Sequence, residues 1–216
     1  MKIARNRQFF TYARLSLLLA AVFFAGCASP YRQGAGKFGT VVVDAGHGGF
    51  DRGGRSVSGA PEKTLALDTA RRLAKVLRSK GFRVIETRTR DVFVPLGSRT
   101  ATSNAVGDSI FVSIHYNWAP RRGARGIEIY YFSPRSWRLA SNILKEAIRA
   151  YPTETRGVKR NNYYVLRTNR RPAVLCELGF VSNAQDNRYL QNGTYRQRLA
   201  ERVADGIIRE RQSAQR

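Results

Sequence analysis

The chain has 216 residues, of which 43% are hydrophobic, and a formal net charge of +23. This length and apolar content suit one domain with a sizeable core, and they exclude a disordered chain. The positive charge indicates a surface that attracts anionic polymers, such as nucleic acid, phospholipid headgroups or peptidoglycan, but it does not choose among them.

The first 26 residues resemble a bacterial export signal. Basic residues stand near the start, and residues 15–25 form an apolar stretch that is too short to span a membrane. The stretch ends in Phe24-Ala-Gly-Cys27, which resembles the lipobox of lipoproteins. We therefore expect residues 1–26 to be removed as a lipoprotein signal peptide and Cys27 to carry lipid. The alternative is an ordinary signal peptide with an incidental cysteine.

The remaining chain would carry a formal charge of +19 and begin with a tether at residues 27–38, rich in Gly and Ala. Ala28, rather than Asp, follows the cysteine, which favours sorting to the outer membrane, with the domain facing the periplasm of the cell envelope. A lipidated Cys27 leaves Cys176 without a disulfide partner, so Cys176 is expected to be a small buried core residue.

Residues 39–212 are expected to form a single α/β domain. Strands are predicted at 40–44, 82–87, 109–114, 126–131, 163–166 and 173–177. Helices are predicted at 61–80, 96–106, 136–150 and 194–209. This alternation predicts one three-layer domain with a mostly parallel central sheet flanked by helices.

The chain has only two histidines, and both stand at the ends of predicted strands. His47 follows the β-branched run that ends at Asp44, and His115 ends the run that begins at Ser109. In open α/β sheets, ligands gather at the carboxyl ends of the strands. Two neutral imidazoles facing one pocket there would be the start of a zinc site.

A catalytic zinc normally has three protein ligands, and two His with one Glu is a recurrent set. Glu62 begins the next predicted helix, and a glycine-rich loop from Gly48 to Gly59 can return it to the same edge. Glu128 is the rival third ligand, but it lies inside a predicted strand at a less suitable position. Asp44 and Asp51 flank His47 and are candidates for orienting its ring.

Glu177 ends a buried predicted strand, where a carboxylate is unusual unless it is paired or functional. At the carboxyl edge of the sheet it could face the metal-site water and act as a general base.

Residues 40–210 resemble the zinc-dependent N-acetylmuramoyl-L-alanine amidases of the cell-wall amidase type. The resemblance rests on these motifs, in the family's order and at its spacing: Asp44-Ala-Gly-His47-Gly-Gly, Glu62-Lys63, Thr87-Arg88, Ser113-Ile-His115-Tyr-Asn117 and Glu177-Leu-Gly-Phe-Val-Ser-Asn183. It implies that His47, Glu62 and His115 bind Zn²⁺ and that Glu177 is the catalytic glutamate. The implied substrate is the amide that joins the lactyl group of N-acetylmuramic acid to L-alanine of the stem peptide.

Arg88, Arg99 and Asn117 either contact this substrate or bond the backbone near the loops. Two other functions remain open: a zinc peptidase of the stem peptide, and a non-catalytic, lipid-anchored binder of cell wall or polyanions. The intact set of two histidines and two glutamates argues against the binder. We expect peptidoglycan and a membrane, reached through Cys27, as partners, no nucleic acid, and a monomer.

Overall fold

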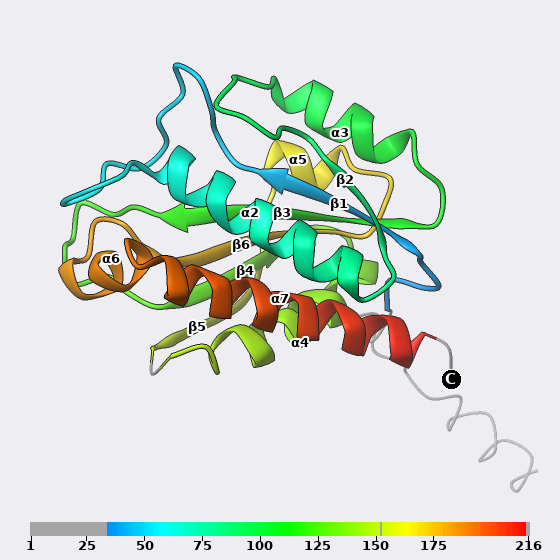
Figure 1. Ribbon diagram of the computed structural model, residues 1–216. Helices are drawn as coiled ribbons and strands as arrows, with labels where there is room; N and C mark the ends of the chain where they lie inside the picture. The colour runs from blue at the N-terminus through cyan, green and yellow to red at the C-terminus, as the bar shows by residue number, and fades with distance from the viewer. Residues whose placement is uncertain (1–33, 152, 215–216) are drawn as a thin grey trace, which may run out of the picture. The chain divides into compact units, whose positions relative to one another are not determined.

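The computed structural model describes residues 34–151 and 153–214, so the expected signal peptide and the lipidated Cys27 lie outside it. A six-stranded sheet in the order β2-β1-β3-β6-β4-β5 lies between helices on both faces (Figure 1). Its strands are β1 Thr40–Ala45, β2 Arg83–Glu86, β3 Ser109–Asn117, β4 Ile127–Tyr131, β5 Thr155–Arg160 and β6 Ala173–Phe180. The helices are α2 Glu62–Ser79, α3 Leu96–Asn104, η2 Pro134–Ser136, α4 Trp137–Ala147, α5 Tyr164–Arg167, α6 Ala184–Leu190 and α7 Gly193–Ser213.

Four adjacent strands, β2, β1, β3 and β6, are mutually parallel. β4 pairs antiparallel with β6, and β5 pairs parallel with β4, so this edge of the sheet runs the other way. The prediction of a single three-layer α/β domain with a mostly parallel sheet is confirmed. None of the described helices has the length and apolar character needed to cross a membrane.

The two faces of the sheet bury cores of different size, because successive side chains of a strand point to opposite faces. On one face, Val41 and Val43 of β1 belong to a large core that includes buried side chains of α2, α4 and α7. On the other face, Val42 packs in a small cluster with Val165 and Leu166 of α5. The face with the small cluster leaves room for a pocket at the carboxyl ends of the strands.

The predicted strand at residues 163–166 is wrong, because this segment forms the one-turn helix α5. Val165 and Leu166 are consecutive, yet both pack into the same small cluster. A strand would send them to opposite faces, whereas a helical turn lets both reach the core.

β5 and α6, like the short helix η2, were not predicted. β5 is a partly exposed edge strand of sequence Thr-Arg-Gly-Val-Lys-Arg, which lacks the apolar alternation of a buried strand. α6 is a short helix whose N-terminus is capped by Asn183, which accepts hydrogen bonds from the amides of Gln185 and Asp186. The asparagine before this segment was the available signal for the helix start.

Candidate active site

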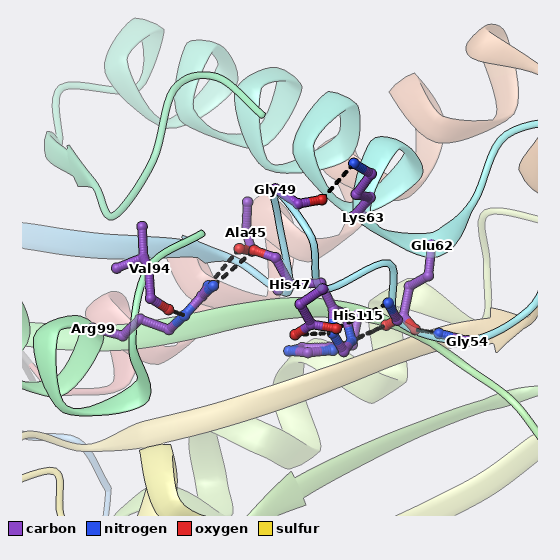
Figure 2. Close-up of polar contacts among 12 residues, drawn as sticks. Ala45, His47, Gly49, Gly54, Glu62, Lys63, Val94, Arg99 and His115 are labelled. Carbon is purple, nitrogen blue, oxygen red and sulfur yellow. Dashed lines mark hydrogen bonds and ion pairs between the residues drawn. The ribbon is translucent and has the colours of Figure 1, made fainter. Parts of the chain in front are cut away.

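His47, Glu62 and His115 meet at the carboxyl edge of the sheet (Figure 2). His115 lies near the end of β3, His47 follows β1, and Glu62 is the first residue of α2. Glu62 Oε1 lies 3.0 Å from His47 Nε2 and 3.0 Å from His115 Nδ1. The ligand atoms of the three side chains all lie within 4.8 Å of one another. The structure thus brings together three residues that are far apart in the sequence.

Glycines make this close approach possible. A Cβ on Gly46 would lie 2.3 Å from the ring of His115, so no other residue fits beside that ring without a shift. Gly53 has a φ of +68°, and a Cβ there would lie 2.6 Å from Glu62 Oε2 and 2.7 Å from His47 Cδ2. The glycine-rich loop therefore folds back tightly enough to return Glu62 to the histidines, as predicted from the sequence.

Hydrogen bonds fix the orientation of the three side chains. Glu62 Oε1 accepts the amide of Tyr116 at 3.0 Å, and Oε2 accepts the amide of Gly54 at 2.5 Å. His47 Nδ1 lies 2.9 Å from Asp51 Oδ2, which leaves Nε2 facing the cluster. Asp51 therefore orients the ring of His47, whereas Asp44 contacts Thr87, Arg99 and Ser113 instead.

The electrostatics of the cluster favour an ionised Glu62. Burial raises the pKa of Glu62, but hydrogen bonds and charge from His115 and His47 outweigh it and bring the pKa well below its usual value. For His47, burial lowers the pKa, and Glu62 and Asp51 more than restore it. Two imidazole nitrogens and one ionised carboxylate are the ligand set of a recurrent class of catalytic zinc sites. The residues present therefore fit such a metal ion.

Glu177 lies beside this cluster. In the sheet it is the register partner of His115 on one side and of Glu128 on the other. The residue lines the pocket, but its Oε2 atom is buried and has no hydrogen-bond partner among the described residues. Burial, and then the carboxylates of Glu62 and Glu128, raise the pKa of Glu177 well above its usual value. Such a carboxyl binds a proton readily, as proton transfer requires.

Glu128, the rival ligand in the sequence analysis, lies outside the His–Glu–His cluster. Its Oε1 accepts hydrogen bonds from Asn117 Nδ2 at 2.5 Å and from the hydroxyl of Tyr130 at 2.8 Å. Its Oε2 is paired with Arg156 and Lys159 of β5. Although burial raises its pKa, these donors bring the pKa of Glu128 below its usual value, so an ionised carboxylate stands next to Glu177. The sequence carried no signal for this network, because β5 was not predicted.

The two arginines proposed as substrate contacts bond mainly to the backbone. Arg88 is buried and donates to the carbonyls of Ala45 and Gly46 at 2.9 and 2.6 Å. Arg99 donates to Asp44 Oδ1 and to the carbonyl of His47, both at 2.7 Å, and to Ala45 and Val94 (Figure 2). These bonds support a role in holding the loop that carries His47, although Arg99 also lines the pocket.

A pocket of about 490 Å³ opens over the cluster and Glu177. Apolar and aromatic side chains form much of its wall: Phe93, Val94, Leu96, Trp118, Tyr163, Tyr164, Val165 and Leu175. The sequence does not mark Phe93 or Trp118 as part of the site, because an exposed aromatic side chain in a loop belongs to no periodic pattern.

The geometry can be compared with known proteins. The profile of the N-acetylmuramoyl-L-alanine amidase family matches residues 41–209, which includes the cluster and Glu177. The chain belongs to the N-acetylmuramoyl-L-alanine amidase family. The resemblance inferred from the motifs is therefore confirmed, and with it the assignment to a family of peptidoglycan-hydrolysing enzymes.

Individual relatives match this chain over different lengths. It is 36% identical over 197 residues to the uncharacterized protein YqiI of Bacillus subtilis, spanning 89% of this chain and 94% of YqiI. It is 36% identical over 170 residues to the probable cell wall amidase LytH of Staphylococcus epidermidis, spanning 78% of this chain but 57% of LytH. The structure of the amidase AmiC2 of Nostoc punctiforme has a TM-score of 0.77 at 34% identity, covering 85% of this chain and 100% of AmiC2.

Proposed function

We propose that this chain hydrolyses the amide between the lactyl group of N-acetylmuramic acid and L-alanine of the stem peptide, with the help of a zinc ion. The observation that carries the proposal is the meeting of His47, Glu62 and His115 within 4.8 Å of one another, next to Glu177. Membership of the amidase family supports the choice of bond. The pocket of about 490 Å³ above these residues has the size of a typical ligand-binding site.

His47, Glu62 and His115 would hold the metal ion, and Asp51 would keep the ring of His47 turned toward it. Bound zinc supplies Lewis-acid chemistry: it lowers the pKa of water to about 7 and polarises a carbonyl group. Arg88 and Arg99 donate hydrogen bonds to the carbonyls of Gly46 and His47, so they keep the ligand His47 in place.

Glu177 is the proposed general base. Its carboxyl group lines the pocket beside His115, within the same row of side chains across the sheet. It accepts the proton that the attacking water loses and then gives this proton to the leaving nitrogen of L-alanine. A raised pKa suits the first transfer, because it makes the carboxylate a stronger base.

We propose the cell envelope as the place of action. The family acts on cell-wall peptidoglycan, and LytH, a relative, is a probable cell wall amidase. Lipidation at Cys27 would tether residues 39–212 to the outer membrane on its periplasmic side, with residues 27–38 as the tether. This part of the proposal rests on the order of charged, apolar and Ala-Gly-Cys residues at the start of the chain.

Mass spectrometry of purified disaccharide-peptide fragments tests the proposed reaction. The zinc-loaded protein is expected to release an intact disaccharide and a free peptide that begins with L-alanine. Products cut within the stem peptide would instead indicate a zinc peptidase. Binding to peptidoglycan without any product would indicate a non-catalytic cell-wall binder.

A further inference from the structure

Two exposed phenylalanines form a stacked pair at the rim of the pocket. The ring centroids of Phe50 and Phe93 lie 4.2 Å apart, and their planes differ by 30°. Phe50 is 80% exposed and Phe93 is 42% exposed, although both are large apolar side chains. Exposed apolar groups of this size, next to a pocket, mark a surface that a ligand covers. Metal binding by the His–Glu–His cluster does not explain why these two rings are exposed.

Hydrogen bonds and an ion pair hold the two phenylalanines in place. Gly49 donates its amide to Asp91 Oδ1 at 2.8 Å, and Lys63 donates to the carbonyl of Gly49 at 2.7 Å (Figure 2 shows the latter). Lys63 also pairs with Asp91, so the loop that carries Phe50 is fastened to the segment that carries Phe93. The two rings therefore present a preformed apolar platform, which limits the entropy lost when a ligand binds.

This platform continues the wall of the pocket, since Phe93, Val94 and Leu96 all line it. Phe50 stands three residues after His47, so the platform lies on the His47 side of the cluster. Two other exposed rings of the pocket wall, Tyr164 and Tyr163, have partners of their own. Tyr164 lies under the guanidinium of Arg167 at 5.2 Å, and Tyr163 meets Tyr130 edge-to-face at 5.1 Å. Among the described residues, no cation and no third ring covers the phenylalanine pair.

Charge distinguishes the two parts of the substrate. The carboxylates of Asp51 and Asp91 stand near the platform, with side chains 40% and 51% exposed. Asp91 is paired with Lys63 and Asp51 bonds His47, so neither carboxylate is a free charge, and the uncharged rings suit a neutral N-acetylated sugar. On the other side of Glu177, Arg156 and Lys159 pair with the single carboxylate of Glu128, which leaves a net positive charge there for stem carboxylates.

We propose that Phe50 and Phe93 bind the glycan part of the substrate, with the C–H face of an amino-sugar ring stacked on the exposed ring of Phe50. This inference rests on the proposed function and adds to it a sugar-binding subsite on the His47 side of the metal cluster. The scissile amide then lies over the cluster, and the stem peptide extends toward β4 and β5.

Two substrates separate sugar recognition from cleavage: a disaccharide-peptide, and a lactyl-peptide that has the same scissile amide but no sugar. Phe50→Ala is expected to raise KM for the disaccharide-peptide about 3- to 10-fold with little change in kcat, as loss of an aromatic contact would. Cleavage of the lactyl-peptide is expected to stay at the wild-type level. Phe50→Tyr keeps the aromatic face and should behave as wild type.

Val57→Ala is the matched control, because Val57 is also an exposed apolar residue but does not belong to the stacked pair. It should leave both substrates unaffected. Equal loss on both substrates in Phe50→Ala would overturn the proposal, since it would show that Phe50 supports the loop or the stem peptide. An unchanged KM for the disaccharide-peptide would overturn it as well.

A binding measurement keeps this test separate from the proposed reaction. Saturation-transfer NMR with a neutral oligomer of N-acetylglucosamine needs no turnover. The wild type is expected to transfer saturation to the sugar ring protons and Phe50→Ala to lose most of this signal, whereas an equal signal would overturn the proposal. A wild type that binds the oligomer but cleaves neither peptide would refute the proposed function and leave the sugar subsite standing.

Discussion

Glu177 has an unusual position for a carboxyl group, because its Oε2 atom is buried without a hydrogen-bond partner among the described residues. Buried carboxyl oxygens without donors are costly and are therefore rare unless they have a function. The neighbouring carboxylates of Glu62 and Glu128 add to this cost, since like charges disfavour ionisation of the third group. These features favour a role in proton transfer over a role in stability.

Glu177→Gln should lower kcat roughly 10²- to 10⁴-fold, because the amide keeps the shape of the side chain but cannot accept a proton. Zinc content and melting temperature should stay close to wild type. All three quantities can be measured on the same preparation, with the exposed Glu201→Gln as a matched control. A structural role for Glu177 predicts the reverse pattern: loss of about 1–3 kcal/mol of stability with turnover retained.

Loss of one ligand should empty the metal site. The wild type is expected to bind about one zinc ion per chain, and His115→Ala should bind much less after dialysis, because two ligands hold zinc weakly. Elemental analysis by mass spectrometry gives the zinc content directly. Tyr163→Phe is a suitable control, since Tyr163 lines the pocket but does not belong to the cluster. Full zinc occupancy in His115→Ala would remove His115 from the site.

At the scale of elements, α4 and α7 pack unusually closely. A Cβ on Gly206 of α7 would lie 2.5 Å from Ile143 Cα and 2.8 Å from the carbonyl oxygen of Asn142, both backbone atoms of α4. Backbone atoms cannot rotate away, so the helices would have to separate. Gly206 weakens the propensity of α7 for helix, but it permits the contact that closes the large core.

Gly206→Ala should therefore destabilise the domain by about 1–2 kcal/mol, because the strain of separating the helices exceeds the gain of about 1 kcal/mol in helix propensity. Chemical denaturation measures this difference in the free energy of unfolding. Gly193→Ala in the same helix is the control, since its Cβ would meet only the flexible ends of Arg72 and Arg196 at 3.4 and 3.7 Å. Equal stability in both variants would show that the helices separate at no cost.

The face of the sheet that carries the small hydrophobic cluster shows how elements position the site. The nine-residue helix α3 and the one-turn helix α5 lie on this face, whereas the other face carries the longer helices α2, α4 and α7. The pocket occupies the space that this short cover leaves at the carboxyl edge. Its lining includes His115 and Glu177, which the pairing of β3 and β6 brings side by side.

At the scale of the whole molecule, the proposed anchor can be tested by cell fractionation. The wild-type chain should sediment with membranes, and Cys27→Ser should be released into the soluble periplasmic fraction, because it has no thiol to carry lipid. Cys176→Ser is a control for loss of a cysteine, since Cys176 is buried in the core. A wild type that is already soluble in the periplasm would refute the anchor.

The sequence by itself determined the elements with strong local patterns and the residue types of the site. The β-branched runs before His47 and around His115 marked the strands, and the glycine-rich loop before Glu62 indicated a sharp return. These signals are local, because the residues that make up a helical or strand pattern stand within a few positions of one another in the sequence. Together with the motif order, they were sufficient to propose the ligand set and the family.

Only the tertiary structure decided which groups stand next to one another. Strand register placed Glu177 between His115 and Glu128, and edge strand β5 supplied the cations that hold Glu128. Long-range packing made residues 164–167 a helix despite their β-branched and aromatic character, and it joined Phe50 to Phe93. The physical reason is that register, edge pairing and contacts between loops depend on residues distant in the sequence, which no local pattern encodes.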